Sequence, residues 1–342
     1  MRFVRAGTGV CAARLTLGIA SLALLVSACQ VSSASGSGSA SGGTITVGVV
    51  PGADNAPLRV AVDDGLFRAH GLNVTIQTYT SLRPEFQALT SGHIDIAAGD
   101  YADFFYEQAT QAASLHLIAD GYDATSNLME VLTLPGSDVT TPTDLTGKTV
   151  ATPQAQLIPP NQGNSYMTDN APFNMETLAT EAVLQSDGVS PSSVTWKPTP
   201  PQDMIPELAS GQVKAILVTE PLILQAEAQL GAVELLDSCS GETASIPLSG
   251  YFSLASYDRA HASDVAAFQA ALSTAQANSA MRGPVQAVLP SFAGISAQEA
   301  ALVTLGTYPT FLNVGQVQRV AGLMYDSGMI TNPLSVNSML SP

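Results

Sequence analysis

Apolar and polar positions between residues 44 and 100 follow two alternating periods. Runs with an apolar residue at every second position, such as Ile45, Val47 and Val49, indicate buried strands, and apolar residues three or four apart indicate helices. The pattern predicts strands over residues 45–49, 74–79 and 94–97 and helices over residues 58–66 and 84–90. Strands that alternate with short helices form a parallel sheet, and loops at the carboxyl ends of its strands converge on a ligand crevice. We therefore expect an α/β fold in which the turns of this stretch face a ligand.

The second half of the chain repeats part of this organisation. Residues 88–97 read ALTSGHIDIA, and residues 207–216 read ELASGQVKAI. The similarity fits two lobes of like architecture with a site between them. The predicted first lobe comprises residues 44–134 and 247–342, and the second comprises residues 135–246. Residues 128–134 are predicted to be one of two strands that cross between the lobes, and the helices after residue 256 are expected to pack onto the first lobe.

The first residues of the chain are predicted to be a leader rather than part of the fold. Arginines precede an apolar run over residues 15–26, which is too short to span a bilayer and is typical of a secretory signal. Small residues directly before Cys29 resemble a bacterial lipobox, at which residues 1–28 are removed and Cys29 carries a lipid. The alternative is an ordinary secretory signal with an incidental cysteine. Residues 29–43, mostly Ser, Gly and Ala, are predicted to be a flexible tether.

Composition excludes several classes of function. The chain has 12 Lys and Arg against 28 Asp and Glu, and removal of the three leader arginines leaves a balance of −19 with His neutral. A chain this acidic is not expected to bind nucleic acid or anionic lipid through a basic patch. If Cys29 is lipidated, Cys239 has no partner for a disulfide or a thiolate metal site. The four histidines lack ligand spacing and no catalytic motif is present, so we expect no metal, no cofactor and no enzymatic activity.

Four motifs, in this order and spacing, resemble a known family. They are DDGLF at residues 63–67, GLNV at 71–74, ALTSGHIDI at 88–96 and TDLTGKTVA at 143–151. Together they resemble the periplasmic-type solute-binding proteins of ABC importers, in the branch that includes binding proteins for nitrate, alkanesulfonates and thiamine-pyrimidine precursors. The resemblance implies a periplasmic-binding-protein-like fold of type II, in which crossing strands join two α/β lobes.

The predicted turns and the resemblance together place ten residues at one cleft. The expected ligand-binding residues are Asp54, Asn55, Ser81, Arg83, Asp100 and Tyr101 from the first lobe and Thr152, Gln154, Asn164 and Glu220 from the second. Each carboxylate has an alternative role, because it can cap the helix that follows it or stabilise that helix through the macrodipole. The polar residues of the long loop over residues 152–173 have solvent exposure as their alternative.

The resemblance implies an extracytoplasmic substrate-binding protein of an ABC importer. We expect a monomer that is anchored to the outer face of the membrane through lipidated Cys29. It would close around a small molecule and present it to the permease subunits. The alternatives are an enzyme on the same fold that acts on a pyrimidine-like substrate, and a sensory module of the cell surface.

The class of ligand remains open between two alternatives. Arg83 is the only basic residue in the cleft turns of the first lobe, so an anion such as a sulfonate would use it together with helix amino-terminal N–H groups. Several carboxylates and tyrosines instead favour a neutral or amine-bearing ring, for example a thiamine-pyrimidine-like solute. Of the two, we favour the heterocycle.

Overall fold

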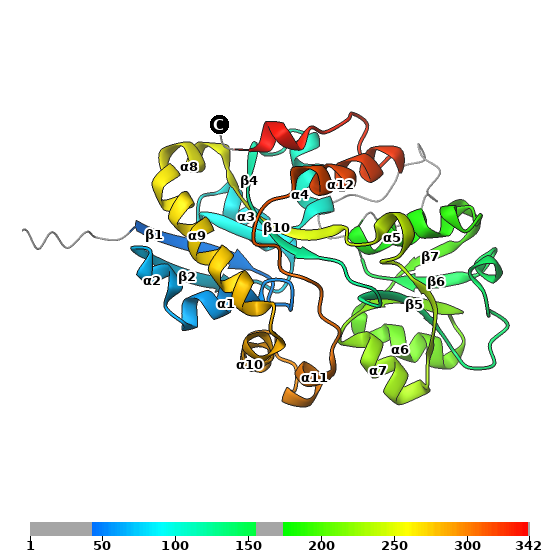
Figure 1. Cartoon of the computed structure of the whole chain (residues 1–342). Coiled ribbons are helices and arrows are strands. Elements are labelled where there is room, and N and C mark those ends of the chain that lie inside the picture. The colour runs from blue at the N-terminus through cyan, green and yellow to red at the C-terminus, as the bar shows by residue number, and fades with distance from the viewer. Residues whose placement is uncertain (1–42, 155–173, 341–342) are drawn as a thin grey trace, which may run out of the picture. The chain divides into compact units, whose positions relative to one another are not determined.

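The computed structural model of the chain describes residues 43–154 and 174–340. These residues form two five-stranded sheets, which Figure 1 shows with their surrounding helices. The first sheet has the order β2 (Leu72–Thr78), β1 (Gly43–Val49), β3 (Ile96–Asp100), β10 (Pro247–Leu254), β4 (Leu115–Asp123). The second has the order β7 (Thr195–Pro198), β6 (Thr149–Thr152), β8 (Ala215–Thr219), β5 (Met129–Thr133), β9 (Val233–Asp237). We call each sheet with its covering helices a lobe.

Both sheets are mixed. In the first lobe β1 runs parallel to β2 and β3, and in the second β6 runs parallel to β7 and β8. One strand in each sheet is antiparallel to these strands: β10 pairs with β3 in the first sheet, and β5 pairs with β8 in the second. The predicted α/β fold with two lobes is therefore confirmed.

Helices cover the faces of both sheets. The chain before β9 forms α1 (Ala56–Asp63), α2 (Leu66–Ala69), α3 (Leu82–Thr90), α4 (Tyr101–Ala109), α5 (Met175–Ser186), α6 (Pro201–Ser210) and α7 (Leu222–Leu230). The remainder forms α8 (Ala255–Ala260), α9 (Ala262–Ser279), α10 (Arg282–Phe292), α11 (Ala297–Leu302) and α12 (Val314–Asp326). Short 3-10 helices span η1 (Pro142–Leu145), η2 (Pro191–Ser193), η3 (Gly241–Thr243) and η4 (Val336–Met339). Among the helices described, none combines the length and apolar character needed to cross a bilayer.

The helix predicted over residues 58–66 is two helices in the structure. Helix α1 ends at Asp63, and α2 begins at Leu66 after a break at Gly65. Gly65 has φ of 70°, in the left-handed region that residues with a Cβ adopt only with strain. The apolar spacing continues through the break because both helices pack on the same side of the first sheet.

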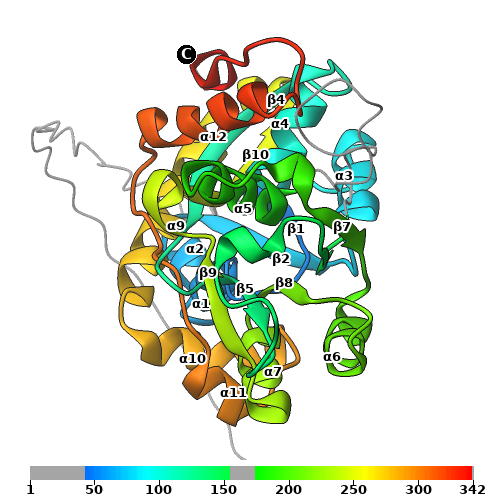
Figure 2. The ribbon, with the colours of Figure 1, turned by 90° about the vertical axis from the view of Figure 1, so that its right-hand side faces the viewer.

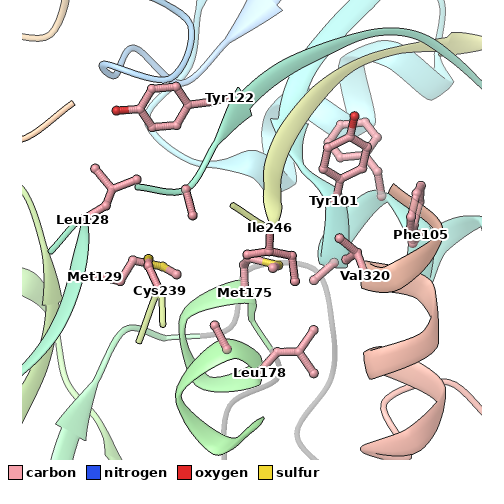
Figure 3. Packing of buried hydrophobic residues seen from close by; sticks show 14 of the residues in the cluster. Tyr101, Phe105, Tyr122, Leu128, Met129, Met175, Leu178, Cys239, Ile246 and Val320 are labelled. Atoms are coloured by element: carbon pink, nitrogen blue, oxygen red, sulfur yellow. The ribbon is translucent and has the colours of Figure 1, made fainter. Parts of the chain in front are cut away.

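Three apolar cores hold the two lobes. One core lies between the first sheet and helices α1, α2 and α9, and a second lies between the second sheet and helices α6 and α7. The largest core covers the opposite faces of both sheets and continues from one lobe into the other. Figure 3 shows this continuity, which runs from Leu128 and Met129 past Met175 of α5 to Val320 of α12. Burial of apolar surface thus stabilises the pair of lobes as well as each lobe.

Within the described residues, the chain crosses between the sheets over residues 124–128 and 238–246. The Ala124 N–H donates to the Ile246 carbonyl, and the Ser238 N–H donates to the Met129 carbonyl, each at 2.9 Å. Sequence analysis assigned residues 128–134 to the first lobe as a crossing strand, but β5 pairs with β8 and β9 in the second sheet. All five residues of β5 are buried, as a central strand requires. The chain returns to the first sheet through β10.

The carboxyl-terminal helices contact both lobes, although sequence analysis placed them on the first lobe alone. Helix α10 packs on α1, and α12 packs on α4 of the first lobe and on α5 of the second. Figure 2 shows α12 and α5 next to each other. The Gln225 side chain of α7 also donates to Glu299 of α11 at 3.0 Å. The last part of the chain therefore connects the lobes.

Replacement of Phe252 by Ala should destabilise the protein by about 3–5 kcal/mol, because the substitution leaves a cavity in the largest core. Phe252 has no exposed surface and stacks on Phe104, with ring centroids 4.4 Å apart. Phe311→Ala is the control, because this ring is 70% exposed, and its effect should stay within about 0.5 kcal/mol. Urea unfolding measures both values. A loss below about 1 kcal/mol for Phe252→Ala would contradict this account of the core.

Candidate functional site

A cavity of about 400 Å³ lies between the two lobes. The parallel strands β1 and β3 of the first lobe and β6 and β8 of the second all end at it. Ligand sites in open α/β sheets lie outside the carboxyl ends of strands in this way. The lining residues are Val50, Pro51, Gly52, Ala53, Asp54, Leu82, Ala98, Gly99, Asp100, Asp103, Tyr122, Leu128, Met129, Pro153, Gln154, Asn174, Met175, Glu176, Thr219, Glu220, Leu248, Ser249 and Thr304.

The structure brings some of the predicted site residues to this cavity. Asp54, Asp100, Gln154 and Glu220 line it. The residues outside the lining are Asn55, Ser81, Arg83, Tyr101 and Thr152. Asn164 and Cys29 lie outside the described residues.

Asn55 shapes the loop that follows β1. Its side-chain amide donates to the Val50 carbonyl at 2.9 Å and accepts from the Gly52 N–H at 3.2 Å. Because Asn55 is 2% exposed, this amide acts inside the loop and holds the backbone of residues 50–54 as a wall of the cavity. Its role in the structure is thus to position Asp54, its neighbour in that wall.

The two other residues predicted in the turns of the first lobe flank the lining residue Leu82 but are not among the lining residues themselves. Ser81 is the residue before α3, and its side chain makes no capping hydrogen bond. Arg83 is exposed and faces Glu107 of α4, whose pKa is raised by burial and lowered in part by the Arg83 charge.

Tyr101 is a core residue. It is fully buried, and its hydroxyl donates to Asp120 at 2.9 Å behind the cavity wall. Its ring meets Phe252 edge to face, with centroids 5.7 Å apart. Successive residues of a helix point about 100° apart, so Asp100 faces the cavity while Tyr101 faces the core. Burial raises the pKa of Asp120 to about 8, so Asp120 and Tyr101 form a neutral buried pair at neutral pH.

Sequence analysis missed two carboxylates of the cavity, Asp103 and Glu176. Asp103 lies three residues after Asp100, and this spacing places both on one side of α4. Glu176 lies in the first turn of α5, two residues after its N-cap Asn174. The spacing of Asp103 was a usable signal, whereas the position of Glu176 depends on how the chain enters α5. Thr152 is buried at the end of β6, adjacent to the lining residue Pro153.

The cavity is acidic. Five carboxylates line it, Asp54, Asp100 and Asp103 from the first lobe and Glu176 and Glu220 from the second, and none of the described lining residues is Lys, Arg or His. Burial raises the pKa of Asp54 to about 6. Burial, followed by the charges of Asp103 and Glu176, raises the pKa of Asp100 well above its usual range. The residues described contain no group of three or more His, Cys, Asp and Glu arranged to hold a metal ion.

At the starts of α4, α5 and α7, beside the cavity, one N–H group of each helix bonds to a side chain of the protein. Asp100 accepts from the Ala102 N–H at 2.7 Å, and Asn174 accepts from the Thr177 N–H at 2.8 Å. Glu220 accepts from the Leu224 N–H at 3.3 Å. Two alternative roles were considered for Asp100 and Glu220, facing the cavity and stabilising a helix start. The structure shows that each residue does both.

A segment from the end of the chain, residues 303–308, passes along the cavity and the crossing residues. We call it the strap. The Thr304 N–H donates to Glu220 at 2.9 Å, and the Tyr308 hydroxyl donates to the Ala53 carbonyl at 2.7 Å. The Gly306 N–H donates to the Tyr122 hydroxyl, and a Cβ at Gly306 would overlap the Asp123 carbonyl. The strap thus connects Glu220 of the second lobe to the loop that holds Asp54 in the first.

The structure is similar to solved structures of solute-binding proteins. The periplasmic aliphatic sulphonate-binding protein SsuA of Escherichia coli has a TM-score of 0.68 and 18% identity, over 87% of this chain and 97% of that one. The periplasmic nitrate-binding protein NrtA of Synechocystis has a TM-score of 0.57 and 15% identity, over 75% and 68%. The desulfurization enzyme DszB has a TM-score of 0.65 and 15% identity, over 88% and 96%. At these identities the likeness shows the fold.

Sequence comparisons give the family. A comparison with curated proteins finds no match. The family model described as the NMT1-like family matches residues 40–240, more than half of the chain. The chain therefore belongs to the NMT1-like family.

Proposed function

We propose that this protein is the extracytoplasmic substrate-binding protein of an ABC importer. It captures a small nitrogen- or sulfur-containing organic solute and presents it to membrane permease subunits. The cavity between the lobes carries this proposal, because its walls come from the strand ends of both. A solute in this cavity contacts both lobes at once, so binding favours the closed arrangement that a permease recognises.

The similar solved structures support binding without catalysis more than they support an enzyme. SsuA and NrtA are described as binding proteins, and DszB, an enzyme, shows that the same fold also carries chemistry. Cys239, the free cysteine among the described residues, is buried outside the cavity lining, and burial raises the pKa of its thiol. Glu220, the lining carboxylate that bonds the strap, fits a role in closure.

Thermal-shift and calorimetric screening of the purified protein against pyrimidines, thiamine, taurine, alkanesulfonates and nitrate should identify a solute that binds without being altered. Glu220→Ala should weaken its binding about tenfold or more, because the variant loses a cavity carboxylate and its bond to Thr304. Glu227→Ala is the matched control, since Glu227 is an exposed carboxylate on the adjacent α7. Mass spectrometry of the recovered solute separates binding from turnover, and conversion of the solute would favour the enzyme. Failure of every class to bind would contradict the proposed function.

The solute-free protein should lose stability as pH rises from about 4 to about 6. The Asp54 carboxyl has a folded pKa of about 6 against about 3.9 when unfolded, so the folded state binds more protons in this window. Asp54→Asn, which keeps a neutral side chain at every pH, should be about 1–3 kcal/mol more stable than the parent at pH 8 and close to it at pH 4. Urea unfolding at both pH values measures this, with exposed Asp64→Asn as the control. An equal effect of Asp54→Asn at both pH values would refute the assignment.

The lipid anchor is also part of the proposal, and its residues lie outside those described. In a bacterial host, the parent protein should be recovered with the membrane fraction, because lipidated Cys29 would anchor it there. Cys29→Ser should be recovered in the soluble extracytoplasmic fraction. Equal partition of the two proteins would favour the alternative of an ordinary secretory signal.

A further inference from the structure

We infer that the solute held in this cavity is an organic cation, whose protonated nitrogen lies between Asp100 of the first lobe and Glu176 of the second. This inference rests on the proposed function, since it names the class of solute that the same cavity takes. The site is defined by the cavity and its two walls. The charges and hydrogen bonds of those walls decide the charge of the occupant.

An anion finds no positively charged partner in the described walls. Arg83, the basic residue nearest in sequence to the first-lobe turns, is exposed and faces Glu107. Helix amino termini are the other common anion sites, but the Ala102 N–H of α4 and the Thr177 N–H of α5 already bond to Asp100 and Asn174. A sulfonate or nitrate would therefore meet five carboxylates without a compensating charge.

A cation relieves a repulsion that the two lobes impose on each other. Helices α4 and α5 pack against each other and bring their first turns together at the cavity. Asp100 begins α4, Asp103 is buried in its first turn, and Glu176 lies in the first turn of α5. Asp100 caps α4 through the Ala102 N–H, and Asp103 and Glu176 place further negative charge beside it. A nitrogen cation with N–H donors between them forms charge-assisted hydrogen bonds to both lobes.

The remaining walls require the cation to be organic. Leu82, Leu128, Met129, Met175 and Leu248 supply apolar contact, and the ring of Tyr122 supplies an aromatic face. Figure 3 shows Tyr122, Leu128 and Met129 along the crossing residues, with Met175 beyond them. A volume of about 400 Å³ is within the range of small-molecule sites. An apolar or aromatic body with a protonated amine, amidine or aminoheterocycle fits both parts of the cavity.

Benzamidine, benzamide and benzoate test the inference, because they have nearly the same shape and differ in charge at pH 7.5. Calorimetry of the purified full chain should give an affinity for benzamidinium at least tenfold above that for benzamide, with no binding of benzoate. Asp100→Asn and Glu176→Gln should each lower the affinity for benzamidinium about tenfold. Both substitutions keep the side-chain shape and an oxygen acceptor, so α4 and α5 remain capped.

Asp187→Asn is the matched control for Glu176→Gln, because Asp187 is an exposed carboxylate at the opposite end of α5. It should leave the affinity for benzamidinium unchanged. Failure of benzamidinium to bind at 10 mM, or binding of benzoate as tight as that of benzamidinium, would overturn the inference. The proposed function fails separately, only when no solute of the wider screen binds.

Discussion

The arrangement of the site depends on the apolar core that continues from one lobe into the other. The crossing residues lie in this core, where backbone hydrogen bonds join Ala124 to Ile246 and Met129 to Ser238. Because the crossings are short, the carboxyl ends of β1 and β3 face those of β6 and β8 across a small distance. The strap adds a third connection, at Thr304. The cavity therefore exists because apolar burial holds the two sheets together with their strand ends opposed.

Carboxylates around this cavity carry a cost that the fold only partly offsets. Asp54, Asp100 and Glu176 are all shifted toward the protonated form by burial, so the empty cavity disfavours their charges. The capping bond from the Ala102 N–H offsets some of this cost at Asp100. A site kept at such a cost is typical of function rather than stability.

Much of the fold was predictable from local sequence, because apolar period and turn chemistry are local properties. The strand–turn–helix repeat of residues 44–100 is an example. The assignment of residues 128–134 failed because an apolar run shows that a strand is buried without showing in which sheet it lies. The prediction of one helix over residues 58–66 was wrong for a related reason. The apolar face continues through the break at Gly65, so the apolar spacing does not reveal it.

The site was predictable to the level of strand ends and no further. Residues directly after β1, β3, β6 and β8 were expected at the cleft, and Asp54, Asp100, Gln154 and Glu220 line it. Tyr101 was wrongly predicted to line the cavity. It directly follows Asp100, but its side chain points into the core whereas that of Asp100 points into the cavity. Thr304 comes from a segment distant in sequence, and nothing in its neighbourhood predicts where it packs.

The fold leaves the charge of the solute undetermined, and a few side chains at helix starts decide it. Free N–H groups at helix starts suit an anion, and the similar structures include proteins described as binding sulfonate and nitrate. Here Asp100 and Asn174 each accept from one such N–H group, and Asp103 and Glu176 add negative charge beside them. The same backbone geometry then favours a positively charged solute. Classification of such a protein by fold therefore identifies where the solute binds, while its class depends on which side chains occupy the helix starts.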